Sequence, residues 1–211
     1  MKNKISEEIL GHKYGNCVIT QNIILLYIPK NASTTIINSL STIKFRPHQL
    51  NYFNLTEGQL EGKEIVTVLR EPIDRLVSNY VETKLNSSKF PYFYKSTDYI
   101  SLNPLAQFQL YLDTIIKKES ELCKKQYLYL QDIPIEHYLN FHNLNNEFIT
   151  LCSKINHPHK TNLPFTNKRA EKSPHKRLQK SILEYIDNNK NVKEQLQTIL
   201  YKDYEVYNKI K

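Results

Sequence analysis

Two uninterrupted apolar runs in the chain predict buried β-strands. Residues 23–28 are Ile-Ile-Leu-Leu-Tyr-Ile, and residues 65–69 are Ile-Val-Thr-Val-Leu. Such runs are typical of central strands in a parallel sheet, because other elements cover both faces of these strands. Shorter apolar stretches predict two further strands, at residues 17–20 and 138–141. We therefore expect a sheet whose centre is parallel.

Apolar residues at helical spacing follow these strands. The hydroxyl residues at 33–35 would cap a helix that starts after Pro29. Pro72 suits the first turn of another helix, directly after the strand at 65–69. The apolar residues of this second helix are Ile73, Leu76, Val77 and Tyr80. Further helices are expected at residues 104–117, 120–131, 144–155, 175–188 and 192–208.

Strands that alternate with helices predict an α/β protein of three layers, α/β/α, around a mostly parallel sheet. The length of 211 residues fits one domain of this class, and no repeat or linker divides the chain. We therefore expect a single domain over residues 1–211. The segment 156–174 is polar, basic and contains proline, so it is expected to be a long loop. The residues at 175–208 would then form closing helices.

Composition excludes several other classes of protein. Four glycines are too few for an all-β fold with many tight turns, and no apolar stretch reaches the length of a transmembrane helix. The first residues lack the apolar core of a signal peptide. Cys17, Cys123 and Cys152 form no disulfide framework or metal motif, and Cys152 with His157 and His159 lacks a fourth metal ligand. A cytoplasmic protein without a resident metal is expected.

The net charge of +8 is concentrated near the end of the chain. Residues 1–150 carry 16 Lys or Arg and 15 Asp or Glu, whereas residues 151–211 carry 13 and 6. The densest basic part is 158–180, which would attract a nucleotide, a polyanionic glycan, a nucleic acid or an acidic lipid. A solvated basic surface is the alternative interpretation. No helix-turn-helix, zinc-finger or RNP pattern is present, so nucleic acid is not an expected partner.

The first motif with chemical content is Tyr27-Ile28-Pro29-Lys30-Asn31-Ala32-Ser33-Thr34-Thr35. A buried strand leads into a lysine, a turn of small residues and hydroxyls that open a helix. The N–H groups of such a turn and of the helix N-terminus can bind an anion, and Lys30 adds positive charge. The signature GxxxxGK[ST] of nucleotide hydrolases is absent, since Lys30 precedes the turn. A helix capped by Ser33 beside an incidental lysine is the structural alternative.

The second motif runs from Ile65 to Tyr80 and contains Arg-Glu-Pro at the end of a predicted strand. Arg70 is expected at the carboxyl end of that strand, where open α/β sheets bind ligands. Its guanidinium group suits bidentate recognition of phosphate. Ser78 lies off the apolar stripe of the following helix and could face a ligand. In the structural alternative, Arg70 pairs with an acidic neighbour and Ser78 is only solvated.

The two motifs together resemble those of the sulfotransferase superfamily, which uses 3′-phosphoadenosine 5′-phosphosulfate (PAPS) as donor. The segment Pro29-Lys30-Asn31-Ala32-Ser33-Thr34-Thr35 is similar to the family's 5′-phosphosulfate loop. The segment Arg70-Glu71-Pro72-Ile73-Asp74-Arg75-Leu76-Val77-Ser78 resembles its 3′-phosphate motif, Arg-Asp-Pro-x-x-Arg-x-x-Ser, with Glu71 in place of Asp. The branch resembled is the carbohydrate sulfotransferases that include heparan sulfate 2-O-sulfotransferase.

Weaker similarity extends over residues 20–208. Gln126-Tyr127 resembles a short Gln-Tyr motif of the family, and Tyr138–Ile155 resembles the strand and helix that follow it. Tyr201–Tyr207 resembles the closing Tyr-x-x-Asp-Tyr/Phe-x-x-Phe helix. The family's usual Golgi membrane anchor is missing, and residues rich in Lys, Asn and Ile suit an AT-rich genome. The resemblance therefore implies a soluble, bacterial member of the family.

This resemblance implies the P-loop-like sulfotransferase fold and transfer of a sulfuryl group from PAPS to a carbohydrate hydroxyl, without a metal. Lys30 would be catalytic, because it neutralises charge on the bridging oxygen, and Arg70 with Ser78 would bind the 3′-phosphate. Lys168 and Arg169 belong to a stretch similar to the loop that folds over the nucleotide. The residues implied to bind the donor are Lys30, Asn31, Ala32, Ser33, Thr34, Thr35, Arg70, Ser78, Lys168 and Arg169.

A base must take the proton of the acceptor hydroxyl, and a histidine titrates in the suitable range. His48 is the preferred catalytic candidate, because it lies between the two motifs, as the catalytic histidine of the 2-O-sulfotransferase branch does. An ordinary loop histidine is the alternative for this position. Glu57 and Glu61 are rival bases, since other sulfotransferases use Glu. His142 is interpreted as structural, near the end of a strand.

Other functions remain open at this level. A nucleotide or small-molecule kinase is the alternative from a related fold, and a non-catalytic polyanion-binding module would use the basic segment. A sulfotransferase-like protein without activity is a further alternative. The sequence does not name the acceptor, which could be a polysaccharide, a lipid-linked glycan or a small molecule. An anionic glycan would suit Lys172, Lys176 and Arg177, and a lipid-linked glycan would bring the protein to a membrane surface.

Overall fold

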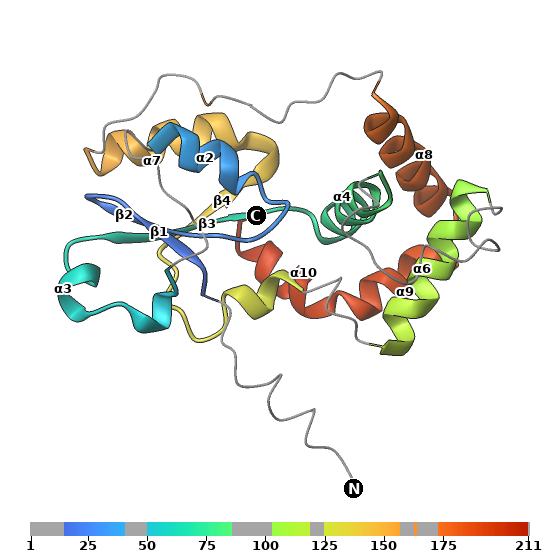
Figure 1. Cartoon of the computed structure of the whole chain (residues 1–211), viewed down its shortest axis with the longest axis horizontal. Helices are drawn as coiled ribbons and strands as arrows, with labels where there is room; N and C mark the ends of the chain where they lie inside the picture. Colours follow the sequence, from blue (N-terminus) through green and yellow to red (C-terminus); the bar gives the residue numbers. More distant parts are fainter. Residues whose placement is uncertain are drawn as a thin grey trace, which may run out of the picture. The chain divides into compact units, whose positions relative to one another are not determined.

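The computed structural model describes residues 15–40, 50–85, 103–118, 125–156, 163 and 173–210. This part of the chain combines α-helices with a four-stranded mixed β-sheet (Figure 1), which confirms the predicted α/β class. It divides into two compact units, each assembled from separate stretches of the chain. The first unit draws on residues 1–70, 125–166 and 206–211, and the second on residues 71–124 and 167–205. Organisation as one domain stays a prediction from the sequence.

The sheet belongs to the first unit and has the strand order β1-β2-β3-β4. Its strands are β1 (Cys17–Ile19), β2 (Ile23–Leu26), β3 (Glu64–Leu69) and β4 (His137–Asn140). Only a short turn joins β1 to β2, so this pair is antiparallel. β2, β3 and β4 run parallel, because the longer connections between them cross over the sheet. All four predicted strands are present, with small shifts at their ends.

Alternate residues of the strands face opposite sides of the sheet, and both sides are covered. On one side, Leu25 packs with residues of α2 (Ser33–Leu40) and α7 (Leu144–Lys154), and Figure 1 shows both helices on the same side of the sheet. On the other side, Ile24 packs with Tyr129 of η5 (Gln126–Tyr129) and with Tyr207 of α10 (Tyr201–Tyr207). This double coverage explains the uninterrupted apolar runs of β2 and β3.

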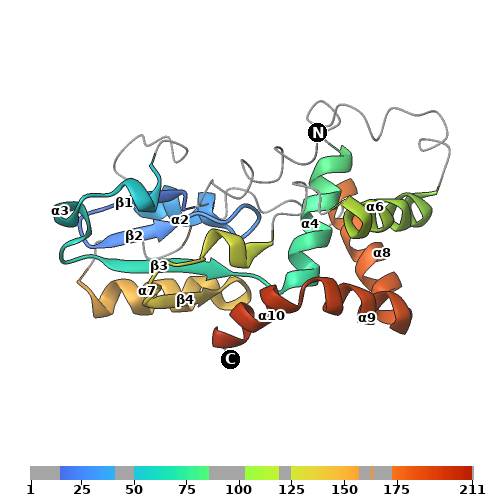
Figure 2. The same ribbon diagram turned by 90° about the horizontal axis from the view of Figure 1, so that it is seen from below.

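The second unit is built from helices. They are α4 (Pro72–Leu85), α6 (Pro104–Lys118), α8 (Pro174–Asn188) and α9 (Lys190–Ile199), which Figure 2 shows grouped together. The apolar stripe predicted after Pro72 is buried in their common core. Within this core, the ring of Tyr80 lies 5.1 Å from that of Phe108 and 4.8 Å from that of Tyr111, measured between centroids. These aromatic contacts fix α4 against α6.

The closing helix predicted at 192–208 is divided in two. α9 ends at Ile199, Leu200 leaves the helical conformation, and α10 (Tyr201–Tyr207) with η7 (Asn208–Ile210) follows. The buried positions of the predicted stripe also belong to two cores. Leu200 packs in the helical core of the second unit, whereas Tyr207 packs beneath the sheet of the first. One straight helix was therefore the wrong prediction, because its apolar residues serve two different clusters.

The helix predicted at 120–131 is also wrong over the residues that the structure describes. From residue 125 onward the chain forms the 3₁₀ helix η5 and a turn, in which Asp132 has a φ of 62°. The side chain of Gln126 is fully buried and bonds to backbone that is distant in sequence. Three short elements had no prediction: η2 (Tyr52–Asn54), α3 (Glu57–Leu60) and η6 (Phe141–Asn143).

Candidate functional site

The loops that follow β2, β3 and β4 meet at one edge of the sheet. Because the three strands are parallel, their carboxyl ends lie together, and this edge is where open α/β sheets bind ligands. The loop after β2 holds Lys30 and leads into α2. Arg70 directly follows β3, and Phe141 directly follows β4. Two segments singled out in the sequence, the Lys30 loop and Arg70, are therefore neighbours in the first unit.

The loop between β2 and α2 has an unusual backbone. Lys30 has a φ of 73° and Ala32 a φ of 57°, a left-handed conformation that costs a residue other than glycine about 1–2 kcal/mol. Such strain persists only where the surroundings hold it, and it gathers at functional sites. Left-handed residues beside right-handed ones also turn successive N–H groups toward a common concavity, which can bind an anion. The backbone thus supports the anion-binding interpretation of this loop.

Some N–H groups of the loop donate hydrogen bonds within the protein. The N–H of Asn31 donates to the oxygen of Ile28 at 3.2 Å, and the N–H of Thr35 donates to that of Ala32 at 2.9 Å. Because α2 begins at Ser33, Ala32 occupies the N-cap, and the hydroxyl residues 33–35 lie inside the first turn. Ser33 is therefore the first residue of the helix and does not occupy the N-cap position expected for it. Donors for a ligand would come from the N–H groups of residues 32–34.

Two buried amide side chains hold this loop to the rest of the unit. Asn31 is 0% exposed, and its Nδ2 donates to the backbone oxygen of Val68 at 2.7 Å and to Oε1 of Gln126 at 2.9 Å. Gln126, also 0% exposed, donates from Nε2 to the backbone oxygen of Arg70 at 2.8 Å. Buried polar groups left unpaired cost about 1–3 kcal/mol, so these contacts fix the loop relative to β3.

Arg70 connects the ends of all three parallel strands. Its guanidinium Nη1 donates to the backbone oxygen of Lys30 at 3.0 Å, and its Cζ lies 4.3 Å from the ring centroid of Phe141. The second contact is a cation–π interaction. Arg70 is only 7% exposed, so its positive charge is held next to the strained loop in a partly desolvated setting. A charge in such a setting acts more strongly on a bound anion than one in bulk water.

The end of β4 adds polar groups to the same edge. The N–H of Asn140 donates to Oε2 of Glu147 at 2.6 Å, and Oδ1 of Asn140 accepts from the N–H of His142 at 2.9 Å. The exposed ring of His142 lies edge-on to Phe141, with centroids 5.4 Å apart. His142 is interpreted as structural from the sequence, and its ring contacts Phe141, the residue that also contacts Arg70. The contact of Phe141 with Arg70 had no signal in the sequence beyond the end of the strand.

The second motif continues into α4 of the second unit. Glu71 caps this helix, because its Oε2 accepts from the N–H of Asp74 at 2.6 Å, and its Oε1 accepts from the hydroxyl of Tyr204. Oδ1 of Asp74 accepts from Nε2 of Gln179 at 2.8 Å. Ser78 is half-buried on α4. Its assignment to the 3′-phosphate stays a prediction from the sequence.

Several predicted residues lie outside the described part of the chain, or away from the Lys30 loop. His48, Lys168 and Arg169 belong to ranges that the structure does not describe. Glu57 and Glu61, the rival bases, are exposed on and next to α3, which leads into the start of β3 (Figure 1). This is the amino edge of the sheet, so the length of β3 separates both carboxylates from the Lys30 loop.

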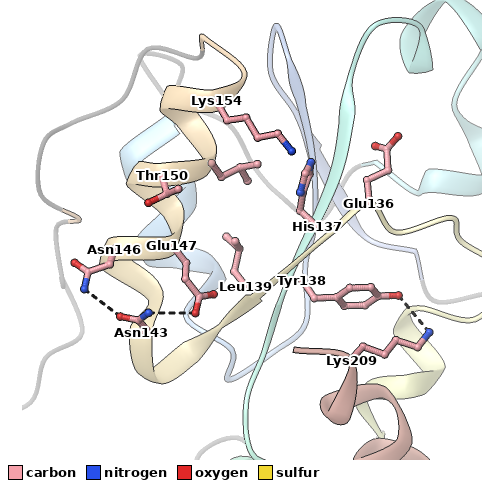
Figure 3. Close-up of a pocket in the computed structure, with 11 residues that line it drawn as sticks. Glu136, His137, Tyr138, Leu139, Asn143, Asn146, Glu147, Thr150, Lys154 and Lys209 are labelled. Atoms are coloured by element: carbon pink, nitrogen blue, oxygen red, sulfur yellow. Dashed lines mark hydrogen bonds between the residues drawn. The ribbon is translucent and has the colours of Figure 1, made fainter. Parts of the chain in front are cut away.

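The first unit also has a cavity of about 490 Å³ between β4 and α7, drawn in Figure 3. Neither Lys30 nor Arg70 lines it. Some of its polar side chains bond to one another: Asn143 with Glu147, and Lys209 with Tyr138 at 3.4 Å. Because neither Lys30 nor Arg70 lines it, the cavity is separate from the predicted site at the carboxyl edge of the sheet.

The cysteines, the potential metal ligands and the hydropathy of the helices indicate which kinds of chemistry the described residues can support. Burial raises the pKa of Cys17 and of Cys152 to about 11, so both thiols are suited to packing rather than to nucleophilic chemistry. Within the described ranges, no cluster of three or more His, Cys, Asp or Glu side chains could hold a metal ion. No described helix has the length and hydropathy needed to cross a bilayer.

Comparison with models of protein families, with curated proteins and with solved structures finds no match to this chain.

Proposed function

We propose that the protein is a PAPS-dependent sulfotransferase that sulfates a hydroxyl of a carbohydrate. One observation carries this proposal. Arg70 of the second motif donates to the backbone of Lys30 in the first motif at 3.0 Å, at the carboxyl edge of a parallel sheet. Two segments proposed from sequence for two phosphates of one nucleotide are thus adjacent. The strained backbone of the loop supports the same interpretation.

The proposal includes the finer description of the fold, a P-loop-like sulfotransferase of three layers. The order β2, anion-binding loop, α2 and parallel β3 supports it. In the donor complex, the N–H groups of residues 32–34 and the N-terminus of α2 would hold the 5′-phosphosulfate. Arg70 and Ser78 would bind the 3′-phosphate, the group that distinguishes PAPS from ATP. Lys168 and Arg169 are retained as predicted phosphate contacts.

The proposed reaction moves a sulfuryl group in line between two oxygens. The acceptor hydroxyl oxygen forms a bond to sulfur, and the bond from sulfur to the bridging oxygen of the 5′-phosphate breaks. The hydroxyl proton passes to a base, for which His48 is the candidate, and adenosine 3′,5′-bisphosphate leaves. Lys30 would offset the negative charge that develops on the bridging oxygen. Positioning and charge stabilisation carry such a transfer, as in phosphoryl transfer.

A carbohydrate acceptor is proposed from the branch that the motifs resemble, with an anionic glycan as the favoured form. Lys176 and Arg177 are exposed on α8, which supports an anionic partner. The same residues favour the second candidate function, a polyanion-binding module without catalysis. Its affinity would fall steeply with salt and would not require a nucleotide. We also propose that the protein is cytoplasmic. If the acceptor is lipid-linked, the protein would contact the membrane surface.

A thermal-shift experiment with adenosine 3′,5′-bisphosphate tests the donor site. Ligand at about 100 times its dissociation constant stabilises a fold by roughly 2.7 kcal/mol. For a chain of this size, that is a shift of about 5–10 °C. We expect this shift with the bisphosphate and not with ATP and Mg²⁺. Lys30→Met should abolish it, whereas Lys63→Met, at the amino edge of the same sheet, should retain it.

The outcomes separate the proposed functions. A shift with ATP and Mg²⁺ alone would favour a kinase. Binding of a sulfated polysaccharide, with no response to either nucleotide, would favour the polyanion-binding module. A bisphosphate shift that survives Lys30→Met would show that the ligand occupies another part of the protein, and the assigned loop would be wrong.

A further inference from the structure

A closed ring of hydrogen bonds joins the Lys30 loop to Arg70. Asn31 Nδ2 donates to Gln126 Oε1 at 2.9 Å, and Gln126 Nε2 donates to the backbone oxygen of Arg70 at 2.8 Å. Arg70 Nη1 donates to the backbone oxygen of Lys30 at 3.0 Å. Because Lys30 and Asn31 are neighbours in the chain, these three bonds close the ring. It contains both segments to which the proposed function assigns the phosphates of the donor.

The buried side chain of Gln126 forms two of the three hydrogen bonds of this ring. It is fully buried, and its bonds to Asn31 and to the backbone of Arg70 link it to both segments. Its Oε1 also lies 3.5 Å from the backbone N of Arg70, so the amide pairs with both polar backbone groups of that residue. A neighbouring strand would pair with them in the same way. Gln126 therefore fixes the backbone of Arg70 just beyond the end of β3.

Hydrogen bonds of Asn31 fix the Lys30 loop in this ring. Asn31 lies between the two left-handed residues, Lys30 and Ala32, and its Nδ2 has a second anchor on the oxygen of Val68 at 2.7 Å. A loop of this conformation would not keep its shape without such support. The ring thus fixes the strained loop and Arg70 relative to each other.

We infer that Gln126 is a positioning residue that sets the spacing between the two phosphate-binding segments. Through this spacing it determines the preference for an adenosine nucleotide with phosphates at both the 3′ and the 5′ position. The inference rests on the proposed function and deepens it. A ligand that bridges both segments gains from their preset separation, whereas a ligand with only a 5′-phosphate does not.

Isothermal titration with adenosine 3′,5′-bisphosphate and with adenosine 5′-monophosphate measures this preference. The ratio used is the dissociation constant of the monophosphate divided by that of the bisphosphate. Gln126→Met keeps the size of the side chain but removes its bonds to Asn31 and Arg70. We expect the ratio to fall on the order of tenfold. Gln126→Glu keeps the acceptor for Asn31 and loses the donor to Arg70, so its ratio should be intermediate. Gln107→Met, at a buried glutamine of the second unit, should leave the ratio unchanged.

Amide hydrogen exchange adds a readout that needs no ligand. The N–H of Asn31, which donates to Ile28, should exchange faster in Gln126→Met than in the unaltered protein, and not in Gln107→Met. If Gln126→Met fails to fold, Gln126→Glu still tests the ratio of dissociation constants, because it removes the bond to the backbone of Arg70.

Each result decides the inference. A reduced ratio together with faster exchange at Asn31 supports it. An unchanged ratio in folded Gln126 variants overturns it and leaves the proposed function standing. If the unaltered protein binds neither nucleotide, the proposed function fails, and this inference fails with it.

Discussion

The guanidinium Nη1 of Arg70 lies 3.0 Å from the backbone oxygen of Lys30 and donates a hydrogen bond to it. These residues are 40 positions apart in the chain and belong to the two motifs that carry the proposed chemistry. The bond brings a buried positive charge next to the loop whose backbone is left-handed at Lys30 and Ala32. The stacking of Arg70 on Phe141 fixes the direction of the guanidinium. Arg70 therefore anchors the loop that contains Lys30 to the end of β3.

The left-handed conformation of Ala32 can be tested by substitution. Ala32→Gly removes the steric penalty and adds flexibility to the unfolded chain, so the free energy of unfolding should change by no more than about 1 kcal/mol. Ala32→Val places a β-branched residue in a conformation it avoids and should destabilise by about 1–3 kcal/mol. Urea unfolding of both variants measures the difference. Equal stabilities would show that residue 32 does not have a positive φ in solution.

The contact of Tyr204 with Glu71 should stabilise the second unit. Tyr204→Phe removes the hydroxyl that donates to the carboxylate and should lower the free energy of unfolding by about 1–2 kcal/mol, because both side chains are half-buried. Tyr201→Phe is the matched control on the same helix, since Tyr201 is 51% exposed. Chemical denaturation followed by circular dichroism checks both. A similar loss in the two variants would argue against a specific role of the Glu71 contact.

The buried cysteines should be unreactive while the protein is folded. Burial raises the pKa of Cys17 and Cys152 to about 11, so at pH 8 both are protonated thiols, and the thiolate is the reactive form. We expect alkylation at pH 8 to modify neither residue until denaturant is added. Mass spectrometry of peptides from native and unfolded samples locates the modified positions. Rapid modification of Cys152 in the native protein would contradict its burial against the sheet.

His48 is the predicted base of the proposed transfer. His48→Ala should abolish sulfuryl transfer and leave bisphosphate binding intact. For a base that must be neutral, kcat/KM should fall as the pH drops through about 6.5, the ordinary pKa of histidine. The pH profile of kcat/KM, measured with a panel of glycan acceptors, is the required experiment.

His142 provides the comparison for this prediction, because it is the exposed histidine beside Phe141. His142→Gln should retain the acidic limb of the pH profile if His48 is the base. Loss of that limb in His142→Gln, with activity preserved in His48→Ala, would transfer the role to His142. Glu57→Gln and Glu61→Gln should have no effect on transfer, because α3 leads into the amino end of β3.

Local signals in the sequence predicted the elements that carry the site. The apolar runs at 23–28 and 65–69 predicted strands, and Pro72 predicted the first residue of α4. These predictions succeeded because burial on both faces and a fixed proline φ are visible in a few adjacent residues. The helix at 120–131 failed because the conformation there depends on a distant partner. Gln126 bonds to the backbone of Arg70, and no neighbour in sequence signals that bond.

The α/β class, the strands and most helices can be predicted from the amino-acid sequence, since they depend on patterns of burial repeated over short stretches. The sequence also placed Lys30 and Arg70 at strand ends. The contact between these two residues, the start of α2 at Ser33 and the support that Gln126 gives to both segments emerge only in the folded protein. The physical reason is that contacts between strand ends join residues far apart in the chain. Their hydrogen bonds depend on the register of the sheet and leave no local trace in the sequence.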